Sequence, residues 1–123
     1  MEETQKKKVL LIDDDAQFTS GLQEKIRNAG MEVFAAKSGK EALDYLVEHE
    51  VDFIILDFIM PEMDGYTFHH ILTHDMKKDI PTIILTNLEG SEDSEQKLEV
   101  FTKAGTDLDA LIGKIKDRLD GVS

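Results

Sequence analysis

The stretch Val51–Gly65 constrains this 123-residue sequence most, because a short apolar run within it ends on a carboxylate. Phe53–Leu56 is continuous, apolar and rich in β-branched residues, which is typical of a strand buried on both faces. Asp57 follows directly, where a buried strand has no structural need for a charge, and Pro61 prevents the strand from continuing in a ladder. We therefore expect Asp57 at the carboxyl end of a central strand, the edge at which open α/β sheets bind ligands.

Four further apolar runs alternate with segments of helical periodicity. The expected strands are 9–12, 31–36, 82–85 and 98–102, and the expected helices start near 18, 38, 65 and 106. Strands that alternate with helices indicate a parallel sheet with helices on both faces. The sequence thus predicts one α/β domain over residues 1–123, built on a doubly wound sheet of five parallel strands.

The helical segments show which side chains face the core. The segment 65–76 is expected to form one helix, with Phe68, Ile71 and Leu72 inward. Ser38 and Glu41 have the spacing of a capping box at a helix start. The apolar positions that follow this cap are placed on one inward face, namely Ala42, Leu43, Leu46 and Val47.

Polar residues stand at the carboxyl ends of four of the five expected strands, namely Asp13 with Asp14, Asp57, Thr86 and Lys103. If the strand order is 2-1-3-4-5, the first and third strands are neighbours and the three carboxylates converge. Converging like charges repel each other and need a cation. Oxygen ligands without His or Cys favour Mg²⁺.

Thr86 and Lys103 are expected on the other side of Asp57. A hydroxyl donor and an ammonium are the groups that stabilise a phosphoryl group in transfer. The set therefore predicts phosphoryl transfer to a carboxylate nucleophile, Asp57.

The sequence resembles the receiver domain of two-component response regulators along nearly its whole length. The matching segments are Leu10–Asp15, Leu56–Gly65, Ile80–Thr86 and Lys103. The resemblance implies the flavodoxin-like strand order 2-1-3-4-5. It also implies that Asp57 is the phosphoacceptor, that Asp13, Asp14, Asp57 and the main-chain carbonyl of Ile59 hold Mg²⁺, and that Thr86 and Lys103 contact the phosphoryl group. The phosphodonor of the family is a histidine kinase or a phosphotransfer protein.

The composition limits the partners. The net charge is −12, which disfavours direct binding to nucleic acid or to an anionic membrane. There are no cysteines, and no apolar stretch is long enough to span a bilayer. The N-terminus lacks the apolar core of a signal peptide, so a cytoplasmic location is expected.

Two other functions stay open from the residues. Asp13 and Asp15, two apart after a strand, also suit a phosphohydrolase with an aspartate nucleophile. A receiver that is never phosphorylated and acts only as a binding surface is the other alternative, and the intact acidic set argues against it.

The segment 87–97 departs from the family, whose fourth helix normally lies here. It holds one apolar residue, Leu88, so it offers no face to bury, and we expect a helix that is short or absent. The sheet over Ile84 and Val100 is then expected to be poorly covered. Such a patch favours a homodimer or an unidentified downstream protein as its partner.

Overall fold

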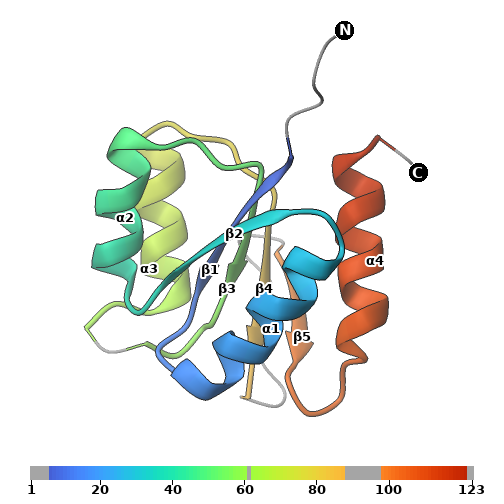
Figure 1. The fold of residues 1–123 in the computed structure, drawn as a ribbon. Coiled ribbons are helices and arrows are strands. Elements are labelled where there is room, and N and C mark those ends of the chain that lie inside the picture. The colour runs from blue at the N-terminus through green and yellow to red at the C-terminus, as the bar shows by residue number, and fades with distance from the viewer. Residues whose placement is uncertain (1–5, 61, 88–97, 122–123) are drawn as a thin grey trace, which may run out of the picture.

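The computed structural model describes residues 6–60, 62–87 and 98–121, whose strands form a single parallel sheet (Figure 1). The strands are β1 (Lys8–Ile12), β2 (Glu32–Ala36), β3 (Phe53–Leu56), β4 (Thr82–Thr86) and β5 (Glu99–Thr102). Their order is β2-β1-β3-β4-β5, so the expected 2-1-3-4-5 order of the flavodoxin-like fold is confirmed. The point at which the order reverses lies between β1 and β3.

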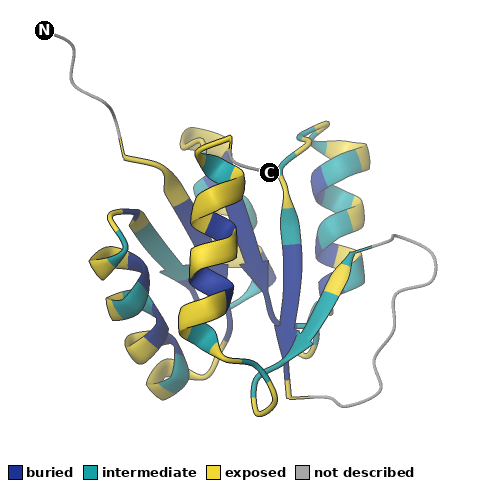
Figure 2. Cartoon of the chain, turned by 90° about the vertical axis from the view of Figure 1, so that its right-hand side faces the viewer, coloured by how far each residue is buried: buried dark blue, intermediate teal, exposed yellow. Residues whose placement is uncertain are grey.

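Four α-helices of the described residues cover the two faces of this sheet (Figure 1). They are α1 (Ala16–Asn28), α2 (Gly39–Glu48), α3 (Gly65–His70) and α4 (Leu108–Leu119). Leu22 of α1 and Ile112 of α4 pack with one set of strand side chains, whereas Leu46 of α2 and Phe68 of α3 pack with the opposite set. The strands at the centre of the sheet are the most buried part of the molecule (Figure 2). The neighbouring strands β1 and β3 are among them, and they end side by side at one edge of the sheet.

The expected cap of α2 forms, but one expected core residue is wrong. Ser38 Oγ accepts a hydrogen bond from the Glu41 amide at 3.1 Å. Val47, however, is 72% exposed, whereas Ala42 and Leu46 are buried. Successive helical residues are about 100° apart, so Val47 lies a quarter-turn beyond Leu46 and points away from the sheet.

The segment 65–76 does not form one continuous α-helix. A π-helical turn, η1 (Ile71–Asp75), follows α3, and the Met76 amide donates to the Ile71 carbonyl at 2.9 Å. Phe68, Leu72 and Met76 all pack in the same apolar cluster and are spaced by four residues. This spacing is longer than the α-helical period of 3.6, and a widened turn keeps the side chains on one face.

The expected uncovered patch beside β5 is wrong at its centre. Ile84 is only 1% exposed, and Val100 is half-buried. The prediction of a short or absent helix within 87–97 falls on 88–97, which lie outside the described residues. Of the helices that the structure describes, none is both long and apolar enough to cross a membrane.

Candidate functional site

The carboxyl ends of the strands bring the predicted polar residues to one edge of the sheet. Asp13 follows β1 and Asp57 follows β3, and the Asp57 amide donates to the Ile12 carbonyl at 2.9 Å. Thr86 ends β4 and Lys103 follows β5, with the Lys103 amide 2.8 Å from the Thr86 carbonyl. These backbone bonds hold the residues in adjacent positions along the edge.

The structure places Asp13, Asp14 and Asp57 together. One carboxylate oxygen from each lies within 4.8 Å of the other two. Asp13 is buried and already has partners, because its Oδ1 accepts from the Asp15 amide at 3.0 Å and its Oδ2 lies 2.6 Å from the Lys103 ammonium. The Asp14 carboxylate is exposed, and within the described residues it has no hydrogen bond or ion pair. The trio offers oxygen ligands to a hard cation such as Mg²⁺.

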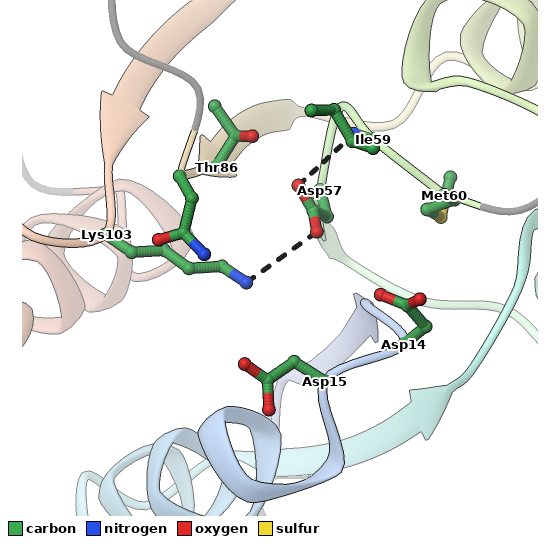
Figure 3. A pocket seen from close by; sticks show the side chains of 8 residues that line it. Asp14, Asp15, Asp57, Ile59, Met60, Thr86 and Lys103 are labelled. Carbon is green, nitrogen blue, oxygen red and sulfur yellow. Dashed lines mark hydrogen bonds and ion pairs between the residues drawn. The ribbon is translucent and has the colours of Figure 1, made fainter.

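Asp57 points into the site from the end of β3 (Figure 3). Its Oδ1 accepts a hydrogen bond from the Ile59 amide at 3.3 Å, and its Oδ2 lies 3.6 Å from the Lys103 ammonium. Burial raises the pKa of Asp57, and the neighbouring Asp13 carboxylate raises it further. Lys103, a hydrogen bond with Thr86 and the Ile59 amide lower the pKa in part, and the net direction is upward. The carboxylate is therefore desolvated and gains from any added cation.

Lys103 supplies the fixed positive charge of the site. Its side chain is 7% exposed, and its ammonium lies between the Asp13 and Asp57 carboxylates. On another side it lies 4.3 Å from the centre of the Phe18 ring. Phe18 carries no functional signal in the sequence, where it reads only as a core position of α1. Its place four residues after Asp14, in the first turn of a helix that starts at this edge, is the one feature that points to the site.

A pocket of about 470 Å³ opens over Asp57 (Figure 3). Its lining combines charged and polar side chains with two apolar ones, of which Ile59 is 54% exposed. The lining residues are Asp14, Asp15, Asp57, Ile59, Met60, Thr86, Asn87 and Lys103. A group the size of a phosphoryl donor can therefore approach Asp57 from solvent.

Two local devices hold the loops around this pocket. Asp15 caps α1, since its Oδ1 accepts from the Phe18 amide at 3.1 Å. Asp64 caps α3 in the same way, accepting from the Thr67 amide at 2.8 Å. At Gly65 a Cβ atom would lie 3.2 Å from the Phe58 Cα, so the absence of a side chain allows α3 to start against the loop that carries Ile59.

The model of the family described as "Response regulator receiver domain" matches residues 9–107. The chain is 34% identical over 96 residues to the probable transcriptional regulator ycf27 of Porphyridium aerugineum, covering 78% of this chain and 39% of that protein. It is 33% identical over 105 residues to a probable cyclic di-GMP phosphodiesterase of Vibrio cholerae, covering 81% of this chain and 23% of the relative. The chain thus spans well under half the length of these relatives.

Solved structures agree with these sequence matches. The receiver domain of the Francisella response regulator 1452 superposes with a TM-score of 0.78 at 27% identity, covering 94% of this chain and 98% of that one. A putative response regulator from Chloroflexus aurantiacus gives 0.80 at 28% identity, with 94% and 99% covered. With a family model that matches most of the sequence and a fold that matches solved receivers, the chain belongs to the response regulator receiver domain family.

Proposed function

We propose that this receiver accepts a phosphoryl group on Asp57 from a histidine kinase or a phosphotransfer protein, in a reaction that needs Mg²⁺. The observation that carries the proposal is the position of Asp57. It is a buried carboxylate that opens into a pocket, 3.6 Å from a lysine ammonium and beside two further carboxylates. Receivers are signalling modules of two-component systems, and this chain is one of them rather than an enzyme with its own substrate.

In the proposed step an Asp57 carboxylate oxygen attacks phosphorus and forms an acyl phosphate. The phosphorus–nitrogen bond of the donor's phosphohistidine breaks, and the leaving imidazole keeps the electron pair and takes up a proton. Lys103 neutralises charge on the transferred group, and the Thr86 hydroxyl donates to one of its oxygens. Both residues lie at the pocket wall, so neither has to cross the site.

The donor set fits Mg²⁺. Asp13, Asp14 and Asp57 supply carboxylates, and we assign the main-chain carbonyl of Ile59 as the fourth protein ligand. When bound, the ion offsets the repulsion among the carboxylates and the charge of the incoming phosphoryl group. The uncompensated Asp14 carboxylate is the ligand most readily available to it.

The same geometry weighs against a phosphohydrolase that uses Asp13 and Asp15. Both oxygens of Asp13 have partners, and Asp15 is occupied in capping α1. We further propose that residues 1–123 act as one receiver domain and that its phosphorylation takes place in the cytoplasm. A downstream protein, not yet identified, would then recognise the phosphorylated domain. The buried state of Ile84 removes the main reason for expecting a homodimer.

Incubation with acetyl phosphate and Mg²⁺, followed by intact-mass measurement, tests the proposal. Wild type is expected to gain one phosphoryl group, and Asp57→Asn to gain none. Asp44→Asn, which removes an exposed carboxylate from α2, is the matched control and should label like wild type. Equal labelling of Asp57→Asn and wild type would overturn the assignment, and repeated turnover of acetyl phosphate that is lost in Asp13→Asn would favour the hydrolase.

A further inference from the structure

The Lys103 ammonium is enclosed on three sides. Asp13 Oδ2 lies 2.6 Å away, Asp57 Oδ2 lies 3.6 Å away, and the Phe18 ring centre lies 4.3 Å away. An ammonium at this distance from an aromatic face is attracted by the negative charge density of the ring, most strongly where water is excluded. With 7% of its side chain exposed, Lys103 meets this condition.

The Phe18 ring has supports other than Lys103, namely the capped first turn of α1 and the core against which it packs. Asp15 caps the helix through the Phe18 amide at 3.1 Å, so the start of the helix is set at this residue. The ring also packs partly buried against the core cluster that contains Leu22. Phe18 is therefore a preformed surface onto which the lysine side chain folds.

The lysine needs such a surface more than the carboxylates do. Lys103 follows β5, an edge strand whose residues are exposed or half-buried, and its side chain has four rotatable bonds. Attraction to Asp13, the nearer carboxylate, draws the ammonium away from Asp57. The Phe18 ring closes one side of the ammonium and so reduces the number of side-chain conformations open to Lys103. The conformations that remain direct the ammonium toward the pocket.

We propose that Phe18 is a positioning residue for phosphorylation, acting through a cation–π contact that holds the Lys103 ammonium at Asp57. The inference rests on the proposed function, in which Lys103 neutralises the transferred phosphoryl group. It is specific to the aromatic ring, because a leucine of similar bulk would preserve packing and lose the attraction to the charge.

The test compares initial rates of phosphorylation by acetyl phosphate. Phe18→Leu is expected to slow the reaction by about 3- to 30-fold, the range that a partly to fully desolvated cation–π contact covers. Phe18→Tyr should restore the rate, since it keeps the ring. Phe34→Leu, a half-buried aromatic on β2, is the control for loss of a ring elsewhere and should react like wild type.

A second arm separates positioning from packing. In a Lys103→Met background, Phe18→Leu should cause no further slowing, because the charge that the ring holds is gone. An equal loss in both backgrounds would show a general packing effect and overturn the inference. Equal rates of Phe18→Leu and wild type would also overturn it, while labelling of wild type on Asp57 would leave the proposed function standing.

Nuclear magnetic resonance gives a readout that does not depend on phosphorylation. The Cε protons of Lys103 should be shifted upfield by the ring current of Phe18, and the shift should vanish in Phe18→Leu and persist in Phe18→Tyr. If wild type is never phosphorylated, the proposed function fails and this shift still decides the contact. Ordinary lysine shifts in wild type would overturn the inference.

Discussion

The carboxylates and the lysine of the site are held in different ways. Asp13 and Asp57 follow β1 and β3, interior strands whose last four residues in each case are buried. Lys103 follows β5, which among the described strands pairs with β4 alone and has no buried residue. The backbone largely determines the position of a short aspartate carboxylate. The lysine ammonium lies several bonds from the backbone, so its position depends on the side chains that it contacts.

This difference separates two kinds of sensitivity. Changes to the carboxylates themselves should act directly on metal binding or on the phosphorylated group, because their positions are set by the strands they follow. The position of the charge on Lys103 should depend on side chains around it, such as Phe18 and Asp13. Substitutions at the carboxylates and at Lys103 can therefore test whether the two are held in these different ways.

The largest effect is expected at the edge strand. Lys103→Met keeps the length of the side chain and removes its charge, and it should slow phosphorylation by acetyl phosphate about 100-fold, the scale for loss of one group that stabilises the transition state. Lys40→Met, at an exposed position of α2, is the control. A rate close to wild type would mean that the edge contributes nothing to the chemistry.

Next in size is the loss of a carboxylate from the acidic trio. Asp14→Ala should weaken Mg²⁺ binding by about 10- to 100-fold, a range seen even when groups that only orient metal ligands are removed. Calorimetric titration of Mg²⁺ measures the change, with Asp44→Ala as control. Unchanged affinity would show that the trio is not the metal site.

A smaller effect is expected at the rim of the pocket. Ile59 is 54% exposed beside Asp57, and an apolar side chain there excludes water and cannot orient it by a hydrogen bond. Ile59→Asn should therefore speed hydrolysis of the phosphorylated form severalfold. Val47→Asn alters an exposed apolar side chain on α2, away from the pocket, and should leave the half-life unchanged.

The smallest effect concerns stability. Burial and Asp13 raise the pKa of Asp57 above its ordinary value of 3.8, so the native state keeps this proton to higher pH than the unfolded chain does. Stability is accordingly lost as pH rises through that window, and Asp57→Asn avoids the loss. Without Mg²⁺ at pH 7 the variant should be more stable by about 1 kcal/mol.

Thermal unfolding at several pH values checks this last expectation. The advantage of Asp57→Asn should shrink as pH falls and be smallest below the ordinary pKa, where the wild-type carboxyl is protonated in both states. Added Mg²⁺ should reverse the ranking, because only wild type keeps the complete ligand set. An advantage that is independent of pH would point to packing instead of charge.

Much of the fold could be predicted because the informative signals are local. The apolar runs before Asp13 and Asp57 need burial on both faces, and the resemblance supplies the strand order that joins them. The prediction that Val47 faces the core was wrong, because it rested on apolar character alone. The angle between Val47 and Leu46 around the helix turns Val47 toward solvent. The prediction that Ile84 is poorly covered was wrong, because its burial depends on tertiary neighbours that the sequence of one segment does not specify.

The site was predictable in its polar members and incomplete in its aromatic one. Asp57, Thr86 and Lys103 stand where charges and hydroxyls have no structural use, so they are visible in the sequence. Phe18 is apolar in an apolar pattern, and its contact with Lys103 exists only once the fold brings the start of α1 and the end of β5 to the same edge of the sheet. Because Phe18 belongs to both the core and the site, the apolar periodicity of its helix shows only its role in the core.

The π-helical turn of Ile71–Asp75 has a consequence for changes in chain length. The start of α3 is fixed at the site by Asp64 and Gly65, and β4 fixes where the chain must return. The widened turn takes up one residue more than an α-helical turn would, between those two anchors. Single-residue insertions or deletions in this helix can thus be absorbed away from the loop of Asp57, so its length can drift while the phosphorylation site keeps its register.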